Sequence, residues 1–110
     1  MSEIQALERL LHHDIPLTGD MGLRVRAWDN HCLRLHVPLA PNVNHKSTMF
    51  GGSLYCAAVL AGWGWLHLRL GEDHGRARLQ LQTQVLDGER CAVTFSGQYV
   101  VVAHTPPAPA

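Results

Sequence analysis

The stretch NVNHKSTMFGGSLYCAAVLAGWGWLHLRL, running from Asn42 to Leu70, decides the fold. A polar segment with an Asn-His-Lys cluster leads through a Phe-Gly-Gly step into a long run that is almost entirely apolar. As a helix, the apolar run from Gly52 to Leu70 would be about 28 Å long, at about 1.5 Å per residue. A helix that is hydrophobic on every face must be buried, either in a membrane or inside a protein.

A membrane is one candidate environment for this helix, because its length reaches the lower range for a span. However, His67 and Arg69 lie near its end, and no strongly basic segment flanks it. We therefore predict a helix wrapped by a β-sheet, and no membrane span. Gly62 and Gly64 each lower helix propensity by roughly 1 kcal/mol relative to Ala, but they allow strands to approach the helix backbone closely.

Alternating apolar and polar residues on both sides of this helix predict two β-hairpins. Residues 23–27 and 33–37 form the first hairpin, across an Asp-Asn turn. Residues 77–85 and 90–102 form the second, across an Asp-Gly turn that suits a tight hairpin. The residues of the first strand that we expect to face inward are Leu23, Val25 and Ala27.

The N-terminal segment predicts a short amphipathic helix. Ser2 and Gln5 have the spacing of a capping box, and the helix should end before Pro16. Its apolar face consists of Ile4, Leu7, Leu10 and Leu11. Acidic residues stand where a signal peptide would need basic ones, so we expect no leader and a cytoplasmic protein.

The length of 110 residues fits one domain, which we place at residues 1–104, followed by a disordered Pro/Ala tail at residues 105–110. A domain of this size buries only about two thirds of the surface of its unfolded chain, so oligomerisation would help it. Nine basic and nine acidic residues cancel, which gives no support to a general attraction to nucleic acid.

The cysteines and histidines indicate neither a metal site nor a redox motif. Three cysteines are an odd number without close spacing, which favours a reduced, cytoplasmic location. Eight histidines have no metal-ligand spacing either, so we expect no metal; scattered surface histidines are the simple explanation.

A polar loop with a Gly-Gly step that opens a long apolar helix resembles the hot-dog fold. Within that fold, the run from Asn42 to Leu70 is similar to the bacterial thioesterase-like domain that occurs alone or fused C-terminal to an acetyltransferase domain. The segment GRARLQLQTQVLDGERCAVTFSGQYV, from Gly75 to Val100, is similar to the closing hairpin of that family. The resemblance covers most of the chain and implies an α+β fold, with an antiparallel sheet wrapped around the central helix.

The resemblance also implies an activity and partners. A hot-dog thioesterase hydrolyses acyl-coenzyme A or acyl-carrier-protein thioesters without a cofactor, as a homodimer or a dimer of dimers. Members of the family usually have two more strands between the helix and the closing hairpin. Here only GEDHG joins Leu70 to Arg76. We therefore expect one or two strands to be missing, either because the chain omits residues or because a partner subunit completes the sheet.

The Gly51-Gly52 step predicts a site for a thioester carbonyl. Glycines allow the backbone to approach a ligand, and the first N–H groups of a helix have no intrahelical acceptors. We expect the N–H groups of Gly52 and Ser53 to stabilise the oxyanion of a tetrahedral intermediate, at the positive end of the helix dipole. The alternative is that the glycines only allow tight packing and that Ser53 acts as the N-cap.

His45 is the candidate general base, because its unperturbed pKa near 6.5 suits proton transfer at neutral pH. Asn44 is the candidate orienting group, through its side-chain amide. The alternative for His45 is a loop histidine that caps a neighbouring carbonyl. The other expected substrate contacts are Lys46, Thr48, Phe50, Gly51 and Tyr55. Solvent exposure is the alternative for Lys46, and core packing is the alternative for Tyr55.

Two departures from the family pattern concern catalysis. No acidic residue occurs from Asn30 to Gly71, although many hot-dog thioesterases have a carboxylate on the first turns of the central helix. Phe50 stands where some relatives have a histidine before Gly-Gly. The alternatives to a thioesterase are therefore a module that binds an acyl thioester or lipid-like ligand without turnover, and a structural dimerisation domain.

Overall fold

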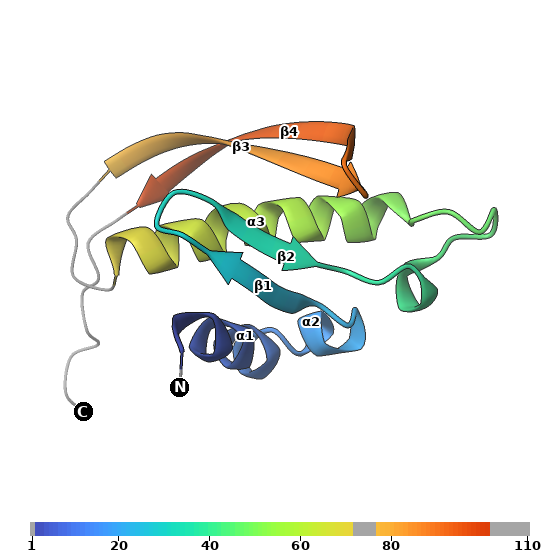
Figure 1. Cartoon of the computed structure of the whole chain (residues 1–110), viewed down its shortest axis with the longest axis horizontal. Coiled ribbons are helices and arrows are strands. Elements are labelled where there is room, and N and C mark those ends of the chain that lie inside the picture. The colour runs from blue at the N-terminus through green and yellow to red at the C-terminus, as the bar shows by residue number, and fades with distance from the viewer. Residues whose placement is uncertain (1, 72–76, 102–110) are drawn as a thin grey trace, which may run out of the picture.

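The computed structural model describes residues 2–71 and 77–101. The long helix α3, Gly51–Leu70, lies at the centre of the molecule, and a β-hairpin packs against each of two sides of it (Figure 1). Both the helix and the α+β class agree with the sequence-based expectation. The expected tail at residues 105–110 and most of the short connection after Leu70 lie outside the described residues.

Helix α1, Glu3–Asp14, begins at the predicted capping box. The N–H of Gln5 donates to Ser2 Oγ over 3.2 Å, and the N–H of Ser2 donates to Gln5 Oε1 over 3.1 Å. The helix ends before Pro16, as expected. Pro16 opens a second short helix that the sequence pattern did not predict, α2, Pro16–Asp20, where proline suits the first helical position.

Strands β1, Arg24–Trp28, and β2, Leu33–His36, form the first hairpin. A β-bulge interrupts their register between Val25 and Ala27, because Ala27 pairs with Arg34 and leaves Arg26 as an extra residue. In such a bulge two residues of one strand oppose one residue of the other. The prediction that Ala27 faces inward is therefore wrong: Ala27 is exposed, and Trp28 is half-buried instead.

The most deeply buried side chains lie between α1, the first hairpin and α3. Leu7 and Leu11 are each 1% exposed and cluster with Leu23 and Val25. Gly64 lies where α3 meets this core, and a Cβ there would be 2.9 Å from Leu33 Cδ2 and 3.2 Å from Leu7 Cδ2. The predicted use of Gly64 for close approach is thus confirmed.

Strands β3, Ala77–Asp87, and β4, Arg90–Val101, form the second hairpin on another side of α3 (Figure 1). Gly88 has a φ of +64° in the turn, a conformation that favours glycine. In the described residues the two hairpins are separate two-stranded sheets that meet through α3. Within the same residues, no helix is long and apolar enough to cross a membrane.

Candidate active site

The loop before α3 projects beyond the first turn of that helix (Figure 1). It follows the short 3-10 helix η1, Ala40–Asn42, and a β-bridge between Val43 and Met49 closes it. Asn42 is buried, and its Nδ2 donates to the carbonyls of Met21 and Pro38 over 2.8 and 2.7 Å. The carbonyl of Asn42 accepts the N–H of Phe50 over 2.7 Å. Asn42 therefore anchors both ends of the loop, a role that the sequence analysis missed.

Asn44 organises the inside of the loop. Its Oδ1 accepts the N–H of Lys46 over 2.9 Å, and both the N–H and the hydroxyl of Thr48 over 3.1 Å. At the tip of the loop, Ser47 has a φ of +61°. The hydrogen bonds of Asn44 to Lys46 and Thr48, on either side of Ser47, stabilise this conformation. The side-chain oxygen of Asn44 and the hydroxyl of Thr48 are thus committed to the loop. Only Asn44 Nδ2 is left for the expected orienting role, which stays a prediction.

His45 and Lys46 are exposed on this loop. Neither side chain makes a hydrogen bond to another described residue, so nothing in the described part of the chain supports the alternative that His45 caps a carbonyl. The imidazole of His45 is therefore accessible to water and to a ligand. Lys46 faces solvent, as its alternative interpretation expected.

The start of α3 presents uncapped N–H donors. Phe50 is the N-cap residue and gives no side-chain cap, and the first helical hydrogen bond runs from Leu54 N to Phe50 O. Among the described residues, the N–H groups of Gly51, Gly52 and Ser53 have no acceptor. The alternative that Ser53 is the N-cap is wrong, because Ser53 is the third residue of the helix.

The two glycines at this helix start differ in their surroundings. A Cβ on Gly51 would meet nothing within 4 Å, so the backbone there is open to an incoming group. A Cβ on Gly52 would lie 2.5 Å from Cε2 of Phe50, whose side chain is 56% exposed. The ring of Phe50 therefore lies beside the helix start, next to the free N–H groups.

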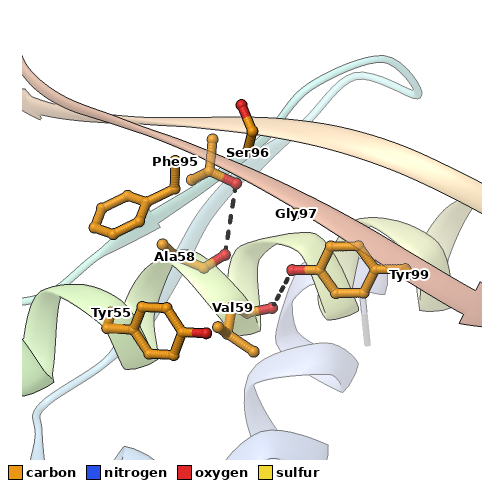
Figure 2. A pocket seen from close by; sticks show the side chains of 8 residues that line it. Tyr55, Ala58, Val59, Phe95, Ser96, Gly97 and Tyr99 are labelled. Carbon is orange, nitrogen blue, oxygen red and sulfur yellow. Dashed lines mark hydrogen bonds between the residues drawn. The ribbon is translucent and has the colours of Figure 1, made fainter.

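A groove of about 60 Å³ lies between α3 and the β3–β4 hairpin (Figure 2). Tyr55 lies on its helix side, 62% exposed, with its ring edge-on to Phe95 at a centroid distance of 6.1 Å. The exposure of Tyr55 rules out core packing and leaves a ligand contact open to test. The groove is lined by Tyr55, Ala58, Val59, Thr83, Phe95, Ser96, Gly97 and Tyr99.

Two hydrogen bonds fix the hairpin to the helix across this groove (Figure 2). Tyr99 Oη donates to the carbonyl of Val59 over 3.0 Å, and Thr83 Oγ1 donates to the carbonyl of Ala58 over 3.5 Å. A Cβ on Gly62 would collide with the phenol of Tyr99, so the close approach predicted for Gly62 is confirmed. Partial burial, and then the charge of Tyr55, raise the pKa of Tyr99 above its usual 10.0.

The sequence analysis missed the residues that the second hairpin contributes to the groove. Their signal was present in the alternation of the closing strand, because Phe95, Gly97 and Tyr99 all have odd numbers and therefore lie on one face of the strand.

Of the expected site residues, hydrogen bonds bring together Asn44, Lys46 and Thr48. Tyr55 lies with the groove instead. No group of three His, Cys, Asp or Glu side chains that could hold a metal is found among the described residues.

A long apolar helix with bare N–H groups, a polar loop before it and a β-hairpin packed on each of two sides of it define a hot-dog domain of the thioesterase-like class. Residues 4–74 match the family described as "Putative thioesterase (yiiD_Cterm)". Because the match spans more than half of the chain, the protein belongs to this family, as the resemblance implied.

Two solved structures have the same fold. A protein from Shewanella oneidensis, described as a "putative thioesterase", superposes with a TM-score of 0.83 at 23% identity, covering 91% of this chain and 97% of that one. A protein of unknown function from Chlorobaculum tepidum superposes with a TM-score of 0.76, also at 23% identity, covering 91% of this chain and 94% of that one. At this level of identity the structures support the hot-dog fold alone.

Proposed function

We propose that the protein hydrolyses acyl thioesters of coenzyme A or of an acyl carrier protein, with the thioester carbonyl bound at the start of α3. The observation that carries the proposal is the set of N–H groups of Gly51, Gly52 and Ser53, which have no acceptor among the described residues. They lie at the N-terminus of the helix, which is the positive end of the helix dipole. The backbone of Gly51 beside them has free space around it for a ligand. In known enzymes, one such oxyanion donor contributes about 2.7–4 kcal/mol to catalysis.

In the proposed reaction His45 takes a proton from water, and the resulting hydroxide adds to the carbonyl carbon. The carbonyl oxygen becomes an oxyanion held by the N–H groups of Gly52 and Ser53. The C–S bond then breaks, the imidazolium returns its proton to the thiolate, and a free acid and a thiol leave. The accessible imidazole of His45 supports this role, and Asn44 Nδ2 is the group proposed to orient the water.

The proposed assembly is a homodimer or a dimer of dimers in the bacterial cytoplasm. Trp63 is a large apolar side chain of α3 that is 39% exposed and does not line the groove, and a second copy would cover it. The odd number of cysteines supports a reducing compartment. Acyl thioesters are the proposed small-molecule partners, and no cofactor is proposed.

The second candidate function is binding of an acyl thioester without turnover. The absence of any acidic residue from Asn30 to Gly71 favours it, because the carboxylate that many hot-dog thioesterases have on the central helix is missing. A binding module would use the same N–H groups and groove. It would leave His45 without a chemical role.

The test is thiol release from acyl-coenzyme A and acyl-carrier-protein substrates of short to long chain. Wild type should release thiol, and His45→Ala should reduce the rate by about 10² or more, the usual contribution of a general base. His13→Ala is the matched control, because His13 is an exposed histidine on α1, outside the site. Equal rates for His45→Ala and wild type would remove His45 from the mechanism, and no release from any substrate by the folded protein would favour the binding module.

A further inference from the structure

We propose that the groove between α3 and the β3–β4 hairpin holds the acyl chain of the thioester and that Tyr99 sets the longest chain it accepts. The inference rests on the proposed function, since the chain must start from a carbonyl at the first turn of α3. It depends on a different part of the molecule, the second hairpin, and so adds a specificity-determining residue outside the loop.

The groove leads away from the free N–H groups along the helix. Tyr55 lies about one helical turn after Gly51, and Val59 lies one turn further. From Gly52 to Val59 the helix rises about 10 Å, at about 1.5 Å per residue. A chain bound through its carbonyl at the helix start therefore meets Tyr55 and Phe95 first and Tyr99 last.

Tyr99 closes the far end of this path and is held in place from two sides. Its hydroxyl donates to the carbonyl of Val59 (Figure 2), and its ring occupies the space left by the missing side chain of Gly62. Gly97 leaves further room for the ring, because a Cβ there would be 3.1 Å from Tyr99 Cε2. A side chain fixed in this way acts as a stop.

The lining selects an apolar occupant. The hydroxyls of Thr83 and Tyr99 are already bound to carbonyls of α3, and Ala58, Val59, Phe95 and Gly97 offer no side-chain donor, so the hydroxyls of Tyr55 and Ser96 are the remaining polar groups of a mostly apolar lining. The groove is small, with a volume of about 60 Å³. The occupant that fits is therefore a short alkyl chain.

The experiment measures binding of S-(2-oxoalkyl)-coenzyme A thioethers, which keep a carbonyl oxygen but cannot be hydrolysed, from 2-oxopropyl to 2-oxododecyl, by calorimetry. Affinity for wild type should rise about fourfold for each added methylene and then level off at a short chain. Tyr99→Ala and Tyr99→Leu should move this plateau to longer chains, because the stop is removed. Gly62→Ala should also move it, because the new methyl group displaces the Tyr99 ring.

Two control variants isolate the ring of Tyr99 as the cause. Tyr99→Phe keeps the ring and should keep the plateau. Gln98→Ala changes a neighbouring exposed side chain on β4 and should leave the whole series unchanged. Circular dichroism confirms that each variant is folded, and Tyr99→Leu provides an apolar replacement if Tyr99→Ala does not fold.

The outcomes separate this inference from the proposed function. A plateau that stays at the same length in folded Tyr99→Leu and Gly62→Ala, or no thioether binding by wild type, would overturn the inference. A plateau that moves while no acyl-coenzyme A and no acyl-carrier-protein substrate releases thiol would support the groove and reject hydrolysis. Thiol release with an unmoved plateau would support hydrolysis and reject Tyr99 as the stop.

Discussion

Two asparagines define the loop before α3 by different means. Asn42 is buried and ties the loop ends to the carbonyls of Met21 and Pro38, whereas Asn44 is half-buried and folds the loop around its own Oδ1. From the sequence, both residues are equally polar members of one short motif. Their roles differ because different backbone groups surround each side chain. The motif alone does not specify these surroundings.

The role of Asn44 predicts different results for two substitutions. Asn44→Ala removes the acceptor of three hydrogen bonds and should destabilise the loop by about 1 kcal/mol. Asn44→Asp keeps an acceptor oxygen and should preserve the loop. Amide hydrogen exchange at Lys46 and Thr48 measures the difference, with faster exchange in Asn44→Ala alone. Equal acceleration in both variants would show that Oδ1 does not hold the loop.

Gly51 provides a test of substrate approach that is separate from stability. Because a Cβ there would touch nothing, Gly51→Ala should leave the free energy of unfolding unchanged or raise it by up to about 1 kcal/mol. Thiol release should nevertheless fall by at least about tenfold, since the methyl group stands where the thioester carbonyl must approach.

The matched control for Gly51→Ala is Gly19→Ala. A Cβ on Gly19 also meets nothing within 4 Å, and Gly19 lies in α2, outside the site. Urea unfolding and thiol release measured on both variants give the comparison. Full activity in Gly51→Ala would place the carbonyl elsewhere than at the start of α3.

At the scale of elements, the turn between β1 and β2 is fixed by one carboxylate. Asp29 Oδ1 accepts the N–H groups of His31 and Cys32 over 2.9 and 2.7 Å, and the carbonyl of His31 accepts Nε1–H of Trp65 on α3 over 2.9 Å. The backbone bonds from Cys32 and then His31 lower the pKa of Asp29 below its usual 3.8. The same turn thus caps the hairpin and joins it to the central helix.

This turn predicts a pH dependence of stability. The folded pKa of Asp29 is lowered, so its stabilising effect is fully present above the unfolded value of 3.8 and is lost as the pH falls through the folded value. The stability difference between wild type and Asp29→Asn should therefore be constant above about pH 5 and shrink below pH 3.8. Chemical unfolding across this range measures it, and a difference that grows on acidification would contradict the prediction.

The sequence pattern predicted the elements better than their details. The capping box of Ser2 and Gln5 and the two glycines of α3 act locally, so their effects could be inferred from spacing alone. The bulge in β1 could not, because Val25, Arg26 and Ala27 continue an acceptable alternation and only the pairing with β2 shows the extra residue. The groove is formed by residues of α3, β3 and β4, and those of the helix lie far in the sequence from those of the strands.

At the scale of the whole molecule, the two halves around α3 are packed differently. The α1 and β1 side contains Leu7, Leu11, Leu23 and Val25, all buried. By contrast, no side chain from residue 78 to residue 100 is fully buried. Regions with few buried apolar contacts open at lower free energy. The second hairpin should therefore be the less stable half.

Native-state hydrogen exchange checks this difference. Amides of β3 and β4 should exchange faster than those of α1 and β1, and an S-(2-oxoalkyl)-coenzyme A thioether that fills the groove should slow the hairpin amides selectively. The amides of α1 are the internal control, because α1 does not line the groove. Uniform exchange in both halves without ligand would mean that the molecule opens only as one cooperative unit.

The bulge in β1 has a consequence for comparing this chain with its relatives. A strand assigns its residues to two faces by the parity of their numbers, and the extra residue Arg26 reverses that assignment partway along β1. Odd positions such as Leu23 and Val25 face inward before it, and the even position Trp28 turns inward after it. A relative without the bulge must either have one residue fewer in this strand or exchange the polarity of the positions that follow. If the gap is placed elsewhere in an alignment, the inward-facing positions of this strand in the relative are aligned with outward-facing positions of this chain.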